Sequence, residues 1–188
     1  MDIIMIRHGE SEDNIQRIFS RDDTSLTAKG IEQIKETKEL LKKFKYDRVY
    51  YSPLRRTVET LGTLGLTGIE EIKIREINFG IFTGKTFEEI SKIYPDETKA
   101  WLDDTQSYII PTGESLLDVY NRVKGFLEEI SKYDENILLV THDCVIRLAL
   151  SWIFDNPEYF FKFKVDNVSI NIISVDDGFK YIKKLNYK

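Results

Sequence analysis

A chain of 188 residues is long enough to form one domain with a sizeable core. Its 41% hydrophobic and 31% charged residues are ordinary for a globular protein and exclude a disordered chain. The net charge of −5 argues against a nucleic-acid partner, which would require a basic face. The single cysteine excludes an internal disulfide and fits a reducing compartment. Because the pattern contains neither a leader nor a membrane span, we expect a cytoplasmic protein with no membrane partner.

The predicted elements alternate between apolar strands and amphipathic helices. Apolar residues at helical spacing are clearest over 116–130, whereas the segment 80–112 is the least regular. The turn Asp176-Asp177-Gly178 predicts a hairpin at the end of the chain. In chain order we expect a strand over 3–6, a polar loop over 7–14, a helix over 28–45, a strand over 49–51, helices over 55–64, 87–93 and 116–130, a strand over 137–140, a helix over 144–154, and strands over 168–175 and 179–185.

This alternation predicts an α/β fold, a three-layer sandwich in which helices cover both faces of a mainly parallel central sheet. In such sheets, ligands bind beyond the carboxyl ends of the strands. Three predicted strands are followed directly by polar, chemically capable residues, namely Arg7-His8-Gly9, Ser52 to Arg56, and His142-Asp143. We therefore expect the functional site at this edge of the sheet.

The only two histidines, His8 and His142, each follow an apolar strand. A lone histidine is usually a core or surface residue, but two at strand ends favour a shared site. A metal site is the first alternative, yet the sequence lacks further ligands at close spacing, so no metal is expected. A cysteine phosphatase is the second alternative, but no arginine-ended phosphate loop follows Cys144, which we expect to be a small core residue.

The motif Arg7-His8-Gly9-Glu10-Ser11, with Asn14 three residues on, resembles the signature of the histidine phosphatase superfamily, also called phosphoglycerate mutase-like. The resemblance continues in the family's order from about residue 3 to residue 147, and it implies a single histidine phosphatase domain over 1–188. The blocks that carry it are Leu26–Gly30 with Gln33, Ser52–Thr60, Arg75–Gly80 with Gly84, Gly113–Ser115, and Val140–His142.

The resemblance implies that His8 is the nucleophile, held in one tautomer by a hydrogen bond from its other ring nitrogen. A phosphomonoester is a dianion near neutral pH, and Arg7 and Arg56 supply permanent charge for its oxygens. His142 would lie opposite as a cation that donates to the phosphoryl oxygens. Glu76 would protonate the leaving oxygen and later activate water, which requires a raised pKa.

Four further residues are expected to bind substrate: Gly9, Asn14, Ser20 and Asp143. Asn14 would act as a neutral donor. Ser20 stands where relatives often have glycine, and it is either a loop residue or another donor. Asp143 also replaces a common glycine, and its carboxylate would repel a phosphate unless it points away or pairs with a cation such as Arg147.

The resemblance implies a cofactor-independent phosphomonoesterase that acts on a small phosphorylated metabolite through a phosphohistidine. The segments Gly113–Ser115 and Asp166–Ser169 are similar to those of α-ribazole phosphatases, which suggests α-ribazole 5′-phosphate as substrate, although many sugar phosphatases share them. A pocket for a planar base would draw on aromatic side chains. The candidates are Phe19, Phe82, Tyr108, Tyr159, Phe160 and Phe161.

Two other functions remain open. Phosphoglycerate mutases of this family are generally longer, with an inserted lid near the acid, and the segment 79–111 has little room for one. A non-catalytic phosphate-binding protein would usually have lost the nucleophile or an arginine, and neither is lost here. Either a monomer or a homodimer is compatible with the sequence.

Overall fold

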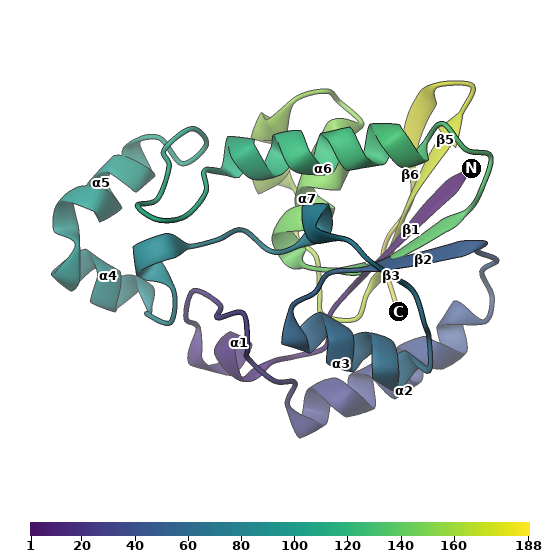
Figure 1. Ribbon diagram of the computed structural model, residues 1–188, viewed down its shortest axis with the longest axis horizontal. Helices are drawn as coiled ribbons and strands as arrows, with labels where there is room; N and C mark the ends of the chain where they lie inside the picture. Colours follow the sequence, from purple (N-terminus) through teal and green to yellow (C-terminus); the bar gives the residue numbers. More distant parts are fainter.

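The computed structural model describes all 188 residues, and its centre is one six-stranded sheet in the order β3-β2-β4-β1-β5-β6 (Figure 1). The first four strands in this order are parallel, whereas β5 and β6 form an antiparallel hairpin at one edge. This confirms the prediction of a mainly parallel sheet. The strands are β1 (Asp2–Arg7), β2 (Arg48–Tyr51), β3 (Ile69–Glu70), β4 (Ile137–Thr141), β5 (Ile170–Asp176) and β6 (Phe179–Tyr187).

Helices cover both faces of this sheet, which confirms the three-layer α/β sandwich (Figure 1). Helices α6 and α7 lie on one face, and α2 and α3 lie on the other. No helix has the length and hydropathy needed to cross a membrane. The helices are α1 (Glu12–Gln16), α2 (Ala28–Leu41), α3 (Arg55–Leu64), α4 (Phe87–Ile93), α5 (Pro95–Asp103), α6 (Leu116–Ile130) and α7 (Asp143–Trp152), with short 3-10 turns η1 (Ile72–Ile74), η2 (Gly80–Phe82) and η3 (Pro157–Lys162).

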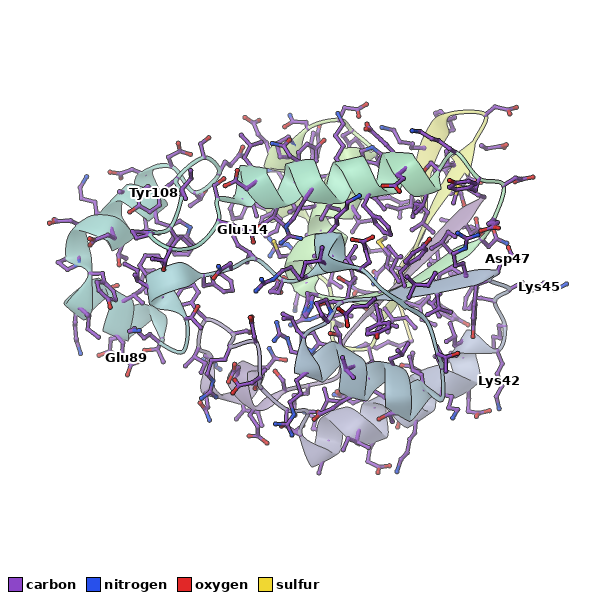
Figure 2. All side chains as sticks on the ribbon, viewed as in Figure 1. Lys42, Lys45, Asp47, Glu89, Tyr108 and Glu114 are labelled. Atoms are coloured by element: carbon purple, nitrogen blue, oxygen red, sulfur yellow. The ribbon has the colours of Figure 1, made fainter.

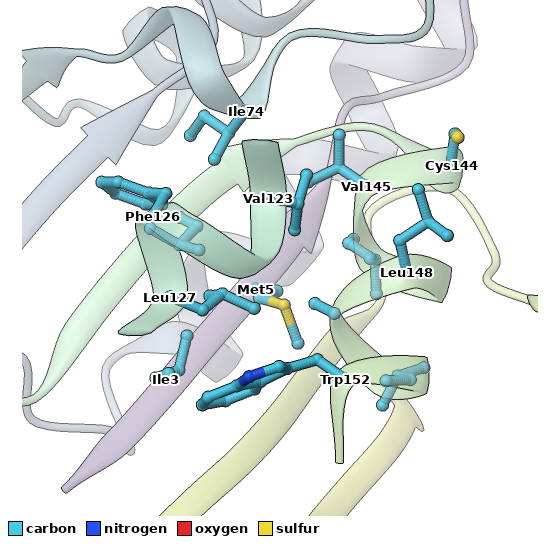
Figure 3. Close-up of a cluster of buried hydrophobic side chains, with 14 of the residues drawn as sticks. Ile3, Met5, Ile74, Val123, Phe126, Leu127, Cys144, Val145, Leu148 and Trp152 are labelled. Atoms are coloured by element: carbon cyan, nitrogen blue, oxygen red, sulfur yellow. The ribbon is translucent and has the colours of Figure 1, made fainter. Parts of the chain in front are cut away.

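The central strand β1 divides its side chains between two apolar cores, because successive residues of a strand point to opposite faces. Ile3 and Met5 pack in the core under α6 and α7, whereas Ile4 and Ile6 pack in the core above α2 and α3. Figure 3 shows Ile3 and Met5 beside Leu127 of α6. All four strand residues are buried, so β1 is anchored from both sides and its carboxyl end is held in place.

Several features of the fold differ from the sequence prediction. Strand β3 was not predicted, and α2 ends at Leu41 and not at residue 45. Residues 12–16, predicted as loop, form α1, whose polar sequence shows no apolar periodicity. At its start, the backbone N–H of Ser11 donates to Asn14 Oδ1. Helix α5 was not predicted; Pro95 occupies its first turn, a position where proline favours a helix start. Strand β5 starts at Ile170 and not at Val168, because Val168 has a left-handed backbone with φ of 52°.

Helices α4 and α5 project beyond the sheet and pack on their own small aromatic core (Figure 1). Phe82, Ile90 and Ile110 are its buried centre, and Phe19 and Trp101 pack against it. Figure 2 shows Glu89 and Tyr108 on this unit, and Glu114 beside the first turn of α6 where the chain returns to the sandwich. The unit lies above the carboxyl ends of the strands and so forms one wall of any site located there.

We predict that Leu127→Ala lowers the free energy of unfolding by about 2–5 kcal/mol, because Leu127 is fully buried in the core under α6. Leu117→Ala is the matched control on the same helix; its side chain is 37% exposed, and a loss of about 0.5 kcal/mol or less is expected. Urea unfolding of both variants gives the comparison. Equal losses would contradict the assignment of the two faces of α6.

Candidate active site

The carboxyl ends of three neighbouring strands meet at one point of the sheet, as the sequence predicted. Strands β2, β4 and β1 are adjacent, and Ser52, His142 and His8 follow them respectively. The two imidazole rings lie side by side, with their centroids 5.3 Å apart. This separation is close to the spacing of about 4.8 Å between neighbouring strands. The parallel sheet therefore brings together two histidines that are 134 residues apart in sequence.

Two hydrogen bonds define the tautomer of His8. Its Nδ1 lies 2.7 Å from the carbonyl oxygen of Gly9, so Nδ1 carries the proton and donates it. Arg56 Nε donates to His8 Nε2 over 3.2 Å, so Nε2 carries the lone pair. Burial and the charges of Arg56 and Arg7 hold the pKa of His8 well below its ordinary value of 6.5. His8 is therefore neutral with its lone pair on Nε2, as a nucleophile must be.

The second histidine is held by Ser52. His142 is fully buried, and its Nε2 lies 2.7 Å from Ser52 Oγ, while its Nδ1 has no partner in the protein. Burial, with the charge of Arg56 next in importance, lowers the pKa of His142 well below 6.5. The free protein therefore has a neutral His142, and the cationic state expected opposite a phosphoryl group stays a prediction for the complex with a phosphate dianion.

Two arginines flank His8 in different ways. Arg56, in the first turn of α3, is only 1% exposed, and its Nη1 donates to the carbonyl oxygen of Arg21 over 2.8 Å. Arg7 uses one Nη1 for both the carbonyl oxygen of Val165, at 2.5 Å, and the carboxylate of Asp143, at 3.4 Å. Its buried Nε has no partner. Arg56 thus has no carboxylate within ion-pair distance, whereas Arg7 contacts the carboxylate of Asp143.

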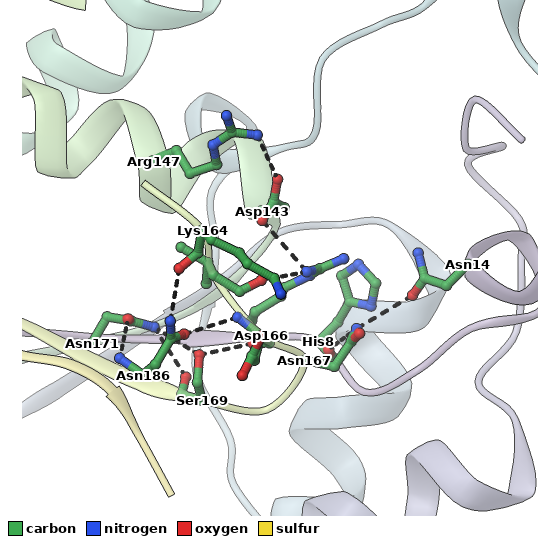
Figure 4. A network of polar contacts seen from close by, with 12 residues as sticks. His8, Asn14, Asp143, Arg147, Lys164, Asp166, Asn167, Ser169, Asn171 and Asn186 are labelled. Carbon is green, nitrogen blue, oxygen red and sulfur yellow. Dashed lines mark hydrogen bonds and ion pairs between the residues drawn. The ribbon is translucent and has the colours of Figure 1, made fainter. Parts of the chain in front are cut away.

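Asp143 pairs with two cations, which removes the expected conflict with a phosphate. Its Oδ1 contacts Arg7, and its Oδ2 contacts Arg147 one turn along α7 at 3.2 Å (Figure 4). Arg147 in turn places its guanidinium carbon 3.7 Å from the centroid of the Phe160 ring. The carboxylate is thus neutralised from both sides, and it holds Arg7 in place.

Asn14 is oriented by its amide oxygen. That oxygen accepts hydrogen bonds from the backbone N–H of Ser11 and from Asn167 Nδ2, which also donates to the carbonyl oxygen of His8 (Figure 4). The NH₂ group of Asn14 is left free to donate, so Asn14 as a neutral donor to the substrate stays a prediction. Sequence reasoning assigned no role to Ser52 or Asn167. The position of Ser52 directly after a strand could have indicated that it belongs to the site.

Gly9 contributes to the site through its backbone and not through a side chain. Its carbonyl orients His8, and its N–H donates to Thr60 Oγ1 over 3.2 Å. A Cβ atom here would lie 2.9 Å from the carbonyl oxygen of Gly30 and 2.9 Å from a side-chain atom of Ile34, so no larger residue fits. Gly9 therefore positions the nucleophile and does not line the cavity beside it.

Glu76 is buried, and its own backbone is held by α6. Burial raises the pKa of its carboxyl group although the charge of Arg56 opposes this. Its Oε1 accepts from the N–H of Ile77 at 3.0 Å. Arg122 donates to the carbonyl oxygen of Glu76 at 3.3 Å and pairs with Glu114 at 2.9 Å. Glu114 is thus a structural carboxylate, and Glu76 is a carboxyl group suited to hold a proton.

A cavity of about 240 Å³ opens beside His8. Six of the nine residues expected at the site line it: Arg7, His8, Asn14, Ser20, Glu76 and Asp143. Arg56 and His142 are buried in the protein interior and do not line the cavity. The cavity thus combines a nucleophilic nitrogen, a fixed positive charge and a carboxyl group, which together suit the binding and transfer of a phosphoryl group. Nowhere do three or more histidine, cysteine, aspartate or glutamate side chains group closely enough to hold a metal ion.

Comparison with known proteins confirms the resemblance inferred from the motifs. The model of the histidine phosphatase superfamily (branch 1) matches residues 3–188. Phosphoserine phosphatase 1 of Hydrogenobacter thermophilus is 33% identical over 98% of this chain and 91% of its own. The α-ribazole phosphatase of Shigella flexneri superimposes with a TM-score of 0.92 at 29% identity, covering 99% of this chain and 96% of that one. A phosphoserine phosphatase of Entamoeba histolytica superimposes with a TM-score of 0.85 at 26% identity, covering 98% of this chain and 96% of that one.

We predict that the protein loses stability as the pH falls below about 6.5, because both histidines bind protons more tightly in the unfolded chain than in the folded one. Between pH 6.5 and 5.5, each histidine contributes a slope of up to about 1.4 kcal/mol per pH unit. Urea unfolding at constant ionic strength measures the slope. His8→Asn and His142→Asn should each make it shallower, with the remaining histidine as internal control. An unchanged slope in both variants would contradict the buried neutral state.

Proposed function

This chain belongs to branch 1 of the histidine phosphatase superfamily and is a phosphoric monoester hydrolase, and we propose that it hydrolyses a small phosphorylated metabolite through a phosphohistidine at His8. The main support for this mechanism is the arrangement of three groups around the cavity. His8 presents a neutral Nε2 beside Arg56, in a cavity that also contains the raised-pKa carboxyl group of Glu76. A nucleophile, a fixed charge and a proton donor then surround one bound phosphate.

In the first step, His8 Nε2 attacks the phosphorus atom and the bond to the leaving oxygen breaks. Glu76 transfers its proton to that oxygen, which leaves as a neutral alcohol. The N–H of Arg56 turns from His8 Nε2 to the phosphoryl oxygens, while Arg7 and the NH₂ of Asn14 hold the others. The dianion also raises the proton affinity of His142, whose unpartnered Nδ1 is available to the site.

In the second step, water attacks the phosphorus atom from the side that the alcohol has vacated. Glu76, now a carboxylate, takes the proton from this water, and the bond between phosphorus and His8 Nε2 breaks. Inorganic phosphate leaves, and His8 returns to its neutral state with the proton still on Nδ1. The hydrogen bond to Gly9 holds the ring in the same orientation through both steps.

The alternatives differ from hydrolysis in the fate of the phosphoryl group. In a mutase it returns to the substrate, which requires the exclusion of water, whereas Ser20 and Asp143 line a cavity that opens to solvent. A non-catalytic binding protein would need no nucleophile, whereas His8 has the tautomer of one. Hydrolysis therefore fits the site best.

For the substrate, we propose α-ribazole 5′-phosphate. The segment Asp166–Ser169 and the likeness to the Shigella flexneri α-ribazole phosphatase support this choice. The 33% identity with phosphoserine phosphatase 1 of Hydrogenobacter thermophilus makes phosphoserine the competing candidate. The protein is proposed to act in the cytoplasm, with no membrane or nucleic-acid partner and with no metal or organic cofactor.

We predict that His8→Ala abolishes turnover, with a loss of at least about 10³-fold, because no other group can accept the phosphoryl group. Brief incubation with ³²P-labelled substrate should label the unmodified protein but not His8→Ala, and the label should be lost in acid and retained in base. His8→Asn is the second variant, since its side chain keeps hydrogen-bonding capacity. Circular dichroism establishes that both variants are folded.

Three outcomes would contradict this mechanism. One is normal activity in His8→Ala. Another is loss of activity after removal of divalent metal with EDTA and its return with added metal. The third is efficient conversion of 3-phosphoglycerate to 2-phosphoglycerate in the presence of 2,3-bisphosphoglycerate, which would establish the mutase alternative.

We predict that the effect of Glu76→Gln depends on the leaving group. An alkoxide leaves poorly unless it is protonated, whereas nitrophenolate needs little help, so the variant should lose about 10²–10⁴-fold on an alkyl phosphate and much less on p-nitrophenyl phosphate. Rapid-quench measurement of the first turnover isolates phosphoryl transfer to His8. Glu128→Gln, a change of an exposed surface residue, is the control. Equal losses on both substrates would assign the proton donation to another group.

A further inference from the structure

Asp13, in the first turn of α1, is the only aspartate of the chain whose side chain is buried, and the burial is complete. Aspartate is almost never buried completely unless its charge is paired. Asp13 does not line the phosphate cavity, so it cannot contact a substrate held there. Its contacts within the protein therefore determine what its buried charge does.

The carboxylate of Asp13 is held by Arg21. The backbone N–H of Arg21 donates to Oδ2 over 2.7 Å, its Nε donates to Oδ1 over 3.2 Å, and its Nη2 also donates to Oδ1. Burial raises the pKa of Asp13, but the hydrogen bonds and the charge of Arg21 outweigh burial, so the pKa lies below its ordinary value. Asp13 is therefore ionised near neutral pH, and it fixes Arg21 at both its backbone and its side chain.

Arg21 in turn fixes Arg56 beside the nucleophile. The carbonyl oxygen of Arg21 accepts from Arg56 Nη1 at 2.8 Å, and Nε of the same guanidinium donates to His8 Nε2 over 3.2 Å. Because a guanidinium group is planar and rigid, the direction of Nη1 also sets the direction of Nε. A movement of the Arg21 carbonyl would therefore turn Nε away from His8.

The segment that carries Arg21 has no helix or strand to hold it. Residues 19–25 lie outside regular structure, and Ser20 within them lines the phosphate cavity. The backbone groups of such a segment need partners from elsewhere in the fold. Asp13 supplies the partner for the N–H of Arg21, and Arg56 supplies the partner for its carbonyl group. The orientation of Arg21 therefore depends on these two side chains.

We propose that Asp13 is a positioning residue of the phosphatase reaction, which sets the direction of the Arg56 guanidinium through Arg21. This inference rests on the proposed function, because the direction of Arg56 matters for turnover only if its N–H groups bind the transferred phosphoryl group. It adds to that function a buried carboxylate that never touches the substrate.

Asp13 also acts on Arg56 through its charge. Burial lowers the pKa of Arg56, whereas three negative charges raise it, those of Glu76, Asp13 and Asp22. Asp22 shares this effect of charge, but its carboxylate is 66% exposed and pairs at 3.1 Å with Arg75, not with Arg21. Asp22 is therefore the matched control that separates the contact with Arg21 from negative charge alone.

The first test needs no substrate. The chain has only two histidines, so ¹⁵N-labelled histidine gives ring-nitrogen NMR signals from His8 and His142 alone. A lone-pair ring nitrogen that accepts a hydrogen bond resonates at a lower ¹⁵N shift than one that does not. Asp13→Ala should therefore move the Nε2 signal of His8 to a higher shift, in the same direction as Arg56→Lys. Asp22→Asn should leave this signal in place.

The second test measures the first turnover on p-nitrophenyl phosphate, whose leaving group needs little protonation. Asp13→Ala should slow phosphoryl transfer to His8 by about 10–100-fold, with a smaller rise in KM, because misplacement of a reacting contact by about 1 Å can cost that much. Asp13→Asn keeps an oxygen acceptor for Arg21 and should recover part of the rate. Asp22→Asn should stay within about twofold of the unmodified protein, as expected for an exposed ion pair.

A double-mutant cycle with Arg56 distinguishes positioning from a general structural role. If Asp13 acts through Arg56, adding Asp13→Ala to Arg56→Lys should slow the first turnover by no more than about threefold further. A loss of the same size in both backgrounds would mean that Asp13 supports the fold regardless of Arg56, and it would overturn the proposal. Circular dichroism establishes that each variant is folded, and Asp13→Asn replaces Asp13→Ala in the cycle if the latter is not.

The outcomes separate this inference from the proposed function. An unchanged His8 signal and an unchanged first turnover in both Asp13 variants would overturn the positioning role and leave the phosphatase standing. An equal loss in Asp22→Asn would assign the effect to charge and overturn the contact through Arg21. Absence of hydrolysis and of His8 labelling in the unmodified protein would overturn the proposed function and the catalytic role of Asp13 with it, whatever the NMR signals show.

Discussion

The parallel pairing of β1 with β4 is the constraint on which the site depends. Its register runs from Ile3 opposite Ile137 to Arg7 opposite Thr141, so the next residue of each strand is a histidine. Because both strands are buried on two faces, neither can slide without moving its apolar residues between the two cores. The 5.3 Å separation of the imidazole rings is thus a consequence of the packing of the whole sheet.

Burial at the end of these strands determines the charge states of the site. Desolvation lowers the pKa of both histidines and raises that of Glu76, while Arg56 keeps a positive charge that is almost completely buried. The free protein therefore holds uncharged histidines beside an excess of positive charge. A phosphate dianion supplies the missing negative charge, so binding and the electrostatics of the fold favour each other.

Residues far from the sheet line a second cavity of about 390 Å³, mostly apolar, which adjoins the site at Glu76. The aromatic unit of α4 and α5 contributes Trp101, and η3 contributes Phe160 and Phe161, to the apolar cavity beside Glu76. Asp143 joins the two regions, because it pairs with Arg7 at the phosphate and with Arg147 at the apolar wall. A substitution at this position would therefore affect both cavities.

The sequence by itself determined the fold class, the main strands and helices, and the blocks that contain His8, Arg56, Glu76 and His142, since apolar periodicity and motif order are local properties. Only the tertiary structure decided how these groups act. The neutral state of His142 depends on burial, the roles of Ser52 and Asn167 depend on contacts across the chain, and the short helix α1 lacks any apolar pattern. The apolar cavity likewise arises where α5, α6, α7 and η3 meet. Desolvation and long-range contacts are properties of the folded chain, which is why no local pattern reveals them.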